Sequence, residues 1–111
     1  MILRDLAHSR AGDKGNTSSL SLIAYDPADY VALRTLITPD RVKAHFAALG
    51  VTEVTRHDLP GLSAMNFVMK NALAGGVTRS LALDAHGKSL SSVFLAMELD
   101  PAEVAAARAA A

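Results

Sequence analysis

The chain has no cysteine among its 111 residues. This absence excludes disulfide bonds, zinc sites built from thiolates and catalysis by a thiol nucleophile. Tryptophan is also absent, so the core must be built mainly from leucine, isoleucine, valine and methionine, with few large rings. Half of the residues are apolar, which is enough for a folded core and argues against intrinsic disorder. The length fits one domain.

An excess of either charge is absent as well. Eleven basic residues balance eleven acidic ones and no basic stripe is present, so we expect no nucleic-acid partner. No run approaches the roughly 20 apolar residues of a membrane span. The N-terminal residues 1–10 lack the basic start and the apolar core of a signal peptide. We therefore expect a cytoplasmic protein that does not enter membranes.

Motifs for catalysis and metal binding are missing too. The histidines form no i, i+4 pair and no His-Glu-x-x-His motif, so no metal site is predicted. No Gly-x-Ser-x-Gly nucleophile elbow occurs. The serines fall mostly on expected strands, where they usually serve as half-exposed spacers. Nothing in the sequence therefore pairs a nucleophile with its base.

Three expected helix starts share the same local chemistry. Asp26, Thr38 and Asp100 each precede a proline. The side-chain oxygen of such a residue accepts from free N–H groups of the first turn, while proline removes a donor that the helix does not use. The second of these helices is expected to begin at Pro39 and to stop at Gly50.

The periodicity of apolar residues predicts the other elements. Residues 1–8, 18–25 and 51–59 are expected strands, residues 62–73 are an expected helix closed by Gly75 and Gly76, and residues 78–84 and 88–99 are an expected hairpin around a turn at 85–87. This order predicts an α+β two-layer sandwich, ferredoxin-like, with helices on one face of a mixed or antiparallel sheet. A doubly wound parallel sheet is the less favoured alternative. Residues 1–100 are expected to form the domain, and residues 101–111 an alanine-rich helix or tail.

The most distinctive stretch is His-Ser-Arg-Ala-Gly-Asp-Lys-Gly-Asn-Thr-Ser-Ser at residues 8–19. Its glycines permit positive φ, so that successive backbone N–H groups can form a nest for an anion. Its cations can add charge-assisted bonds to a carboxylate or phosphate. The candidate anion-binding or substrate-binding residues are Ser9, Arg10, Gly12, Asp13, Lys14, Gly15 and Asn16.

A tight hairpin turn is the alternative for this stretch. Asp13 and Lys14 in a type I turn, with Gly15 left-handed, would need no ligand. Twelve mainly polar residues exceed what such a turn requires, although their spacing matches neither a P-loop nor a dinucleotide fingerprint. Both interpretations stay open. If the stretch performs chemistry, Lys14 and His8 are the candidates for proton transfer, and catalytic residues are otherwise unidentified.

The expected helix at residues 62–73 provides a second group of candidates. Its wide apolar face is formed by Leu62, Met65, Val68, Met69, Ala72 and Leu73. Phe67 falls on the opposite face, as a contact for another chain or a ligand, unless it fills a gap against a neighbouring element. Asn66 is at the edge of the apolar face, where it binds the first loop or a substrate, or makes an ordinary turn bond. Lys70 is either solvated or part of the same site.

Several motifs together resemble one known family. The most specific is Arg-x-Gly-Asp-Lys-Gly-Asn at residues 10–16. It is accompanied by Asn66 with Phe67, by Gly75 with Gly76, and by Asp84 with Gly87 and Lys88. Over about residues 3–99 the chain resembles the small C-terminal domain of AtuA-type proteins, the acyclic terpene utilisation family, whose small domain has a ferredoxin-like fold.

The resemblance implies a context rather than a reaction. In the longer relatives the small domain follows a large N-terminal domain, and the family's gene clusters degrade terpenoid and branched acids as acyl-CoA thioesters. The absence of the large domain here suggests an accessory subunit that pairs with a large AtuA-like protein and contributes the loop to a shared site. No cofactor is implied beyond the CoA moiety of a substrate. The alternative is a self-sufficient homo-oligomeric enzyme or ligand-binding protein that uses the same loop.

Overall fold

Five antiparallel strands form the sheet of the computed structural model, which describes residues 1–14, 17–47, 50–71 and 89–110. The strands are β1 (Ala7–His8), β2 (Ala11–Lys14), β3 (Thr17–Ala24), β4 (Glu53–Leu59) and β5 (Ala64–Lys70). β5 lies between β3 and β4, while β1 and β2 pair one after the other with the outer side of β3. β3 and β5 are therefore central, and the other strands form the two edges.

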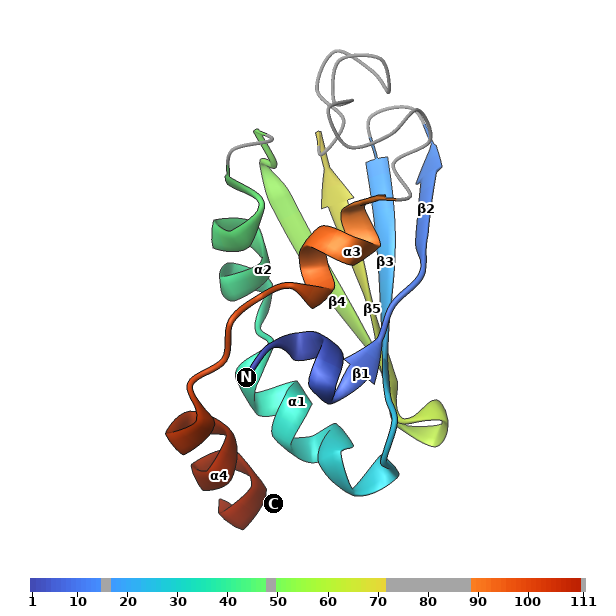
Figure 1. The fold of residues 1–111 in the computed structure, drawn as a ribbon. Coiled ribbons are helices and arrows are strands. Elements are labelled where there is room, and N and C mark those ends of the chain that lie inside the picture. The colour runs from blue at the N-terminus through green and yellow to red at the C-terminus, as the bar shows by residue number, and fades with distance from the viewer. Residues whose placement is uncertain (15–16, 48–49, 72–88, 111) are drawn as a thin grey trace.

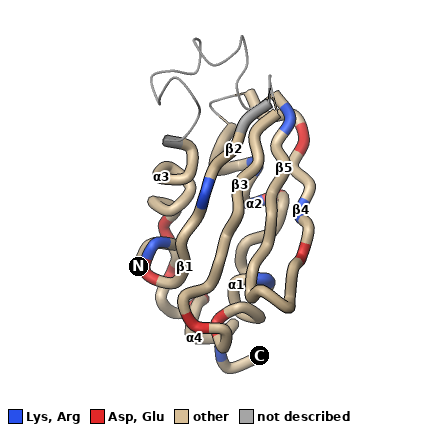
Figure 2. The backbone as a smooth tube through the Cα atoms, turned by 90° about the vertical axis from the view of Figure 1, so that its right-hand side faces the viewer, with Lys and Arg blue, Asp and Glu red and all other residues tan. Residues whose placement is uncertain are grey.

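The described helices lie on one face of this sheet (Figure 1). They are α1 (Tyr30–Leu36), α2 (Pro39–His45), α3 (Ser89–Leu95) and α4 (Pro101–Ala110), with 3-10 turns at η1 (Leu3–Asp5), η2 (Pro27–Asp29) and η4 (Pro60–Leu62). α4 packs against α1 rather than against the sheet. In Figure 2, where the strands are seen obliquely side by side, no described helix lies over the opposite face. The predicted α+β two-layer fold, with helices on one face, is confirmed.

The pleat of the sheet separates core residues from the rest. Along β3, Leu20 and Leu22 are buried against the helices, whereas Ser19 and Ser21 point to the other side and are half-buried. The strand that the sequence predicts at residues 18–25 is confirmed as β3, Thr17–Ala24. The predicted strand at 51–59 is confirmed as β4.

Within the described ranges, no helix combines the length and the hydrophobicity that crossing a bilayer would require.

The capping chemistry at the helix starts is also confirmed. Asp26 accepts a hydrogen bond from the Ala28 N–H at 2.9 Å and begins η2, which leads directly into α1. Thr38 accepts from the Arg41 N–H at 3.2 Å at the start of α2, and Asp100 caps α4 in the same way. α2 ends at His45, earlier than predicted. Gly50 adopts the expected left-handed φ of 78° beyond that end.

The helix predicted for residues 62–73 is wrong, because residues 64–70 form β5. Its apolar residues fit a helical stripe, but Met65, Phe67 and Met69 also alternate, and all three are buried. Hydrogen bonding to strands on both sides then decides in favour of the strand. Phe67 is consequently fully buried, with its ring 5.5 Å from that of Phe94 in an edge-on pair. The predicted exposure of Phe67 is wrong.

Two further predicted strands are corrected at the ends of the chain. Within the predicted strand at residues 1–8, Leu3–Asp5 form the turn η1, and the Asp5 carboxylate accepts from the Ile2 N–H at 2.9 Å. Only Ala7 and His8 pair as β1. Residues 89–95 form α3 instead of a strand. Leu90 and Phe94 are fully buried at a helical spacing of four. Residues 72–88, which include the predicted strand at 78–84 and its turn, lie outside the described residues.

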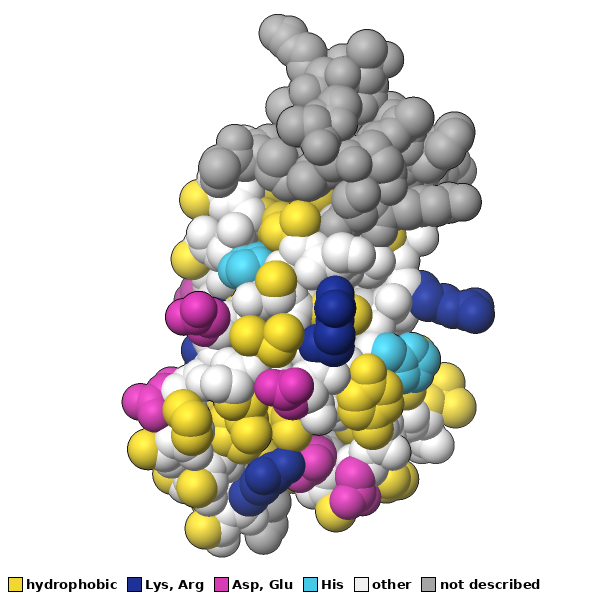
Figure 3. Space-filling model, in the orientation of Figure 1, with side chains coloured by type: hydrophobic (Ala, Val, Ile, Leu, Met, Phe, Trp, Pro, Cys, Tyr) yellow, Lys and Arg dark blue, Asp and Glu magenta, His cyan; other side chains and the backbone are white. Residues whose placement is uncertain are grey.

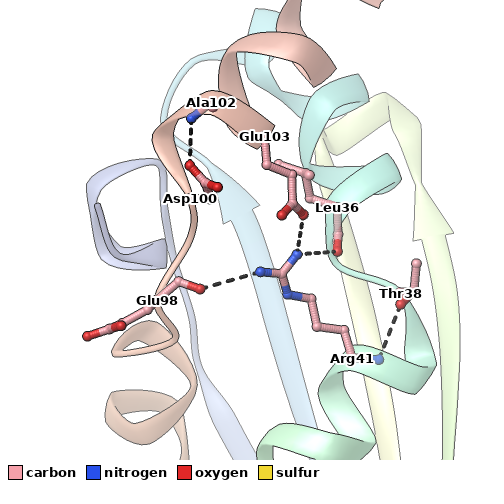
Figure 4. A network of polar contacts seen from close by, with 7 residues as sticks. All are labelled: Leu36, Thr38, Arg41, Glu98, Asp100, Ala102 and Glu103. Carbon is pink, nitrogen blue, oxygen red and sulfur yellow. Dashed lines mark hydrogen bonds and ion pairs between the residues drawn. The ribbon is translucent and has the colours of Figure 1, made fainter.

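Arg41 connects α2 to α4 through a small polar network (Figure 4). Its guanidinium donates to Glu103 Oε1 at 2.6 Å and, at 3.4 Å, to the carbonyls of Leu36 and Glu98. At the far end of α4, Arg108 pairs with Asp29 at 2.8 Å, and this hydrogen bond raises the pKa of Arg108. Acidic and basic side chains are interspersed over this side of the molecule (Figure 3). These contacts fix α4 on the helical layer.

Candidate functional site

The open face of the sheet, opposite the helices, carries a row of polar residues. The antiparallel register aligns Ser21 of β3 with Asn66 of β5, and Asn66 with His57 of β4. Arg10 extends the row at the opposite edge, because its main chain is hydrogen-bonded to Ser21. We call these four residues the polar row. It crosses the sheet from one edge to the other.

Ser21 holds the edge of the sheet in place. Its Oγ accepts from the Arg10 N–H at 2.9 Å and donates to the Arg10 carbonyl at 3.4 Å. The Ser21 N–H donates to the same carbonyl at 2.9 Å. The hydroxyl is thus engaged with the main chain, and no described histidine or carboxylate accepts its proton. Ser21 is therefore not arranged as a nucleophile.

The other members of the polar row present unpaired donors. Asn66 Oδ1 accepts from Ser19 Oγ at 3.0 Å, which leaves the Asn66 amide nitrogen without a partner among the described residues. The Arg10 guanidinium and the His57 imidazole likewise make no hydrogen bond or ion pair within the described part of the chain. A ligand rich in acceptors, such as an anion, is complementary to this set of donors.

Next to the polar row, the open face becomes apolar. The register aligns Ile23 with Ala64 and Ala64 with Leu59, and the turn η4 adds Leu62. A pocket of about 530 Å³ lies here, lined by Ser21, Ile23, His57, Leu59, Leu62, Ala64, Met65 and Asn66. The pocket thus has polar groups from the row at one end and aliphatic side chains at the other.

A second hollow of about 580 Å³ lies on the helical side, next to Arg41 and Glu103. Its charged groups are already engaged with each other and with backbone carbonyls. The donors of Arg10, Asn66 and His57 have no such partners among the described residues, so the open face is the stronger candidate for binding. Within the described ranges, no cluster of three or more histidine, aspartate or glutamate residues is placed to hold a metal ion.

In the described part of residues 8–19, β2 pairs with β3 as far as Lys14 and Thr17. Asp13 and Lys14 are the last residues of β2, opposite Ser18 and Thr17. They do not occupy the centre of a type I turn, so that alternative is wrong in its placement. The register leaves two residues between the paired strands, Gly15 and Asn16, and these lie outside the described residues.

Gly12 does not form the predicted anion nest. It lies in extended β2, opposite Ser19, and the only described glycine with positive φ is Gly50. The Gly12 carbonyl accepts from Ser18 Oγ at 3.3 Å. A Cβ atom added at Gly12 would meet nothing within 4 Å. The fold therefore has room for a side chain at this position on the open face.

Ser9 and His8 lie where the edge changes from β1 to β2. Ser9 Oγ is buried and has no hydrogen-bond partner among the described residues. The His8 side chain is exposed, and its ring stacks on Tyr25 with 5.8 Å between centroids. Both residues adjoin Arg10 in the sequence, so the structure keeps them close to the polar row.

Of the candidates from residues 62–73, only Asn66 belongs to the polar row. Phe67 points into the core instead. Lys70 forms an ion pair with Glu53 at 3.3 Å, and both side chains are more than half exposed. Such surface pairs contribute little. Lys70 is thus a solvated residue at the far end of the open face.

Sequence reasoning missed Ser21, His57 and the aliphatic residues of the pocket. The alternation of Ser19, Ser21 and Ile23 along β3 was the available signal, because such residues share one face of a strand. His57 becomes a candidate only when residues 64–70 are recognised as the strand beside β4.

The family model of the AtuA ferredoxin-like domain matches residues 1–100. The chain belongs to this family. The match confirms the predicted resemblance and fold, and in this AtuA ferredoxin-like domain it includes the whole sheet, the polar row and α1 to α3. α4 begins beyond the matched residues, at Pro101. No curated protein and no solved structure gives a significant match to the chain.

Proposed function

We propose that this AtuA ferredoxin-like domain is an accessory subunit that docks through its open face on a large AtuA-like protein. In this role it would act in the cytoplasm, in the breakdown of terpenoid or branched acids as acyl-CoA thioesters. The β2–β3 hairpin and the polar row would contribute to a shared site for an anionic substrate. The only cofactor-like group required is the CoA moiety of that substrate.

The open face is the observation that carries this proposal. It combines unpaired donors at Arg10, Asn66 and His57 with aliphatic residues that include Leu62, which is 70% exposed. Antiparallel sheets commonly leave one polar face in water, but contiguous apolar surface on such a face often marks an interaction site. A second protein surface would therefore complete what this chain provides as one side of a site.

The charge of the hairpin supports an anionic substrate. Arg10 lies on the open face with its guanidinium free of described partners, and Lys14 is four residues further along the same edge. Cations and amide donors together favour carboxylate or phosphate oxygens. At the open-face positions of the described strands the only carboxylate is that of Glu53, and Lys70 pairs with it.

Co-purification tests the docking. The full chain would be co-expressed with a large AtuA-like protein, and the recovered complex compared for Thr55→Glu and Thr35→Glu. Thr55 is exposed on the open face of β4, whereas Thr35 is exposed on α1, so the same charge is introduced on opposite sides. We expect the complex to be lost in Thr55→Glu and retained in Thr35→Glu.

Equal recovery of the complex in both variants would show that the open face is not the docking surface. A wild-type chain that binds no such partner, together with unchanged growth on branched acids after its deletion, would refute the accessory role.

A self-sufficient homo-oligomeric enzyme or ligand-binding protein is the second candidate. The exposed His8 ring beside Arg10 favours it, because an acid–base group would then adjoin an anion-binding group within one chain. Turnover by the isolated chain that disappears in Lys14→Ala or His8→Gln, together with a mass in solution above that of one chain, would favour this candidate over the accessory subunit.

A further inference from the structure

We propose that the pocket on the open face binds a small carboxylate that carries an apolar chain. This inference deepens the proposed function and rests on it for the biological role of the ligand. The binding itself is assigned to this chain alone, whose residues line the pocket. The volume of about 530 Å³ falls within the usual range for small-molecule sites.

The aliphatic residues at one end of the pocket favour a ligand with an apolar chain. Leu59 and Leu62 are 43% and 70% exposed, and they line the pocket together with Ile23 and Ala64. When an apolar group covers such exposed aliphatic side chains, the free energy of the complex is lowered. A polar ligand without such a group would leave this surface exposed.

The wall that contains Leu62 is held by a strained turn. Ser63 directly follows η4 and adopts a left-handed conformation, with φ of 52° and ψ of 43°. Its N–H donates to the Pro60 carbonyl at 3.1 Å, and its own carbonyl accepts from the Ala24 N–H at 3.0 Å. A non-glycine residue in this region costs free energy and is often found where a binding surface is held in place. Leu62 is therefore presented to the pocket by a fixed backbone.

The hydrogen-bond donors at the other end of the pocket favour a carboxylate group on the ligand. Asn66 and His57 line the pocket, and the Asn66 amide nitrogen and the His57 ring have no described partners. Arg10 is not a lining residue, but its main chain is hydrogen-bonded to Ser21, which is one. All three groups offer donors, and Arg10 adds a full positive charge. A carboxylate accepts several such bonds at once, whereas a neutral hydroxyl group at the same place would make fewer and weaker ones. The site is thus amphipathic, with an anion end and an aliphatic end.

Titration of the isolated full chain with octanoate, below its micelle concentration, tests this assignment. Backbone amide NMR shifts would be followed at Ile23, His57, Ala64 and Asn66. We expect saturable shifts at these residues, binding of 1-octanol about tenfold weaker because it lacks the charge, and no saturable shift with acetate because it lacks the chain.

Variants separate the two ends of the pocket. We expect Arg10→Gln to weaken octanoate about tenfold and to leave 1-octanol unchanged, whereas Leu62→Ser should weaken both. The matched controls are Arg34→Gln and Val31→Ser, exposed residues of α1 on the helical side, and they should change neither ligand. Amide spectra of each variant report whether the fold is retained.

Three results would overturn the proposal. Octanoate could produce no saturable shift; octanol could bind as tightly as octanoate in the wild type and in Arg10→Gln; or the shifts could follow the dissociation of a dimer in sedimentation experiments, which would make a second copy the occupant. Loss of octanoate binding with retained co-purification of a large AtuA-like protein would refute the pocket alone. The reverse result would refute the docking alone.

Discussion

The two faces of the sheet use neighbouring residues of the same strands for different purposes. On the covered face, Phe67 of β5 is fully buried and Arg56 of β4 donates to carbonyls at the end of α1. On the open face, Asn66 and His57 keep donors without described partners. One step along a strand thus separates residues that stabilise the fold from residues that are available to a ligand.

The largest contrast is expected between Phe67 and its neighbour Val68. Phe67→Ala should lower the free energy of unfolding by about 3–5 kcal/mol, because it leaves a cavity beside Phe94. Val68→Ala, on the half-buried open face, should cost about 1 kcal/mol. Urea denaturation of both variants measures the difference. Similar losses would mean that the open face is packed as tightly as the core.

A second contrast concerns Arg56 and His57. The Arg56 guanidinium donates to the carbonyls of Arg34 and Ile37 at 2.7 and 3.2 Å, and it pairs with Asp58 at 2.9 Å. It thereby satisfies the C-terminal end of α1 from the neighbouring strand. We expect Arg56→Gln to cost about 2 kcal/mol, since these are bonds from a charged donor. His57→Gln should change stability by less than about 0.5 kcal/mol.

Thermal or urea unfolding measures the stability of the Arg56→Gln and His57→Gln variants. Titration with octanoate measures ligand binding, for which we expect the opposite order of effects. Octanoate binding should weaken in His57→Gln and persist in Arg56→Gln at temperatures where that variant is folded. If His57→Gln destabilised the protein as much as Arg56→Gln, His57 would have to be regarded as a structural residue.

Local chemistry explains which features the sequence predicts. The helix starts at Asp26, Thr38 and Asp100 depend only on a cap and a following proline, and all three are present. The strands at 18–25 and 51–59 and the fold class also follow from short patterns. The sequence does not predict β5, because its apolar residues suit both a helix and a strand. Pairing with β3, more than 40 residues earlier in the chain, and with β4, the preceding strand, decides in favour of the strand.

The same limit applies to the candidate site. Arg10 and Asn66 were identified as candidates from their residue types, but their membership in one row depends on the register of β3, β5 and β4. His57 and Ser21 have no local signature and emerge only from that register. The error at residues 62–73 also explains why Phe67 was assigned to a contact surface, because a helix would have placed it on the opposite side from Met65 and Met69.

The last expected effect is at Gly12, where a substitution should stabilise the fold instead of weakening it. Gly12 is extended, and an added Cβ atom would meet nothing within 4 Å, so the fold does not require glycine there. Gly12→Ala should therefore stabilise the protein by about 0.4–1 kcal/mol, because alanine restricts the unfolded chain more than glycine does. Urea denaturation measures this gain. A loss of stability would instead show that the strand needs the conformational freedom of glycine.

The same variant also tests partner binding. If it is more stable but binds its large partner less well, the absence of a side chain at Gly12 favours docking, because a bound surface would approach the backbone of β2 closely.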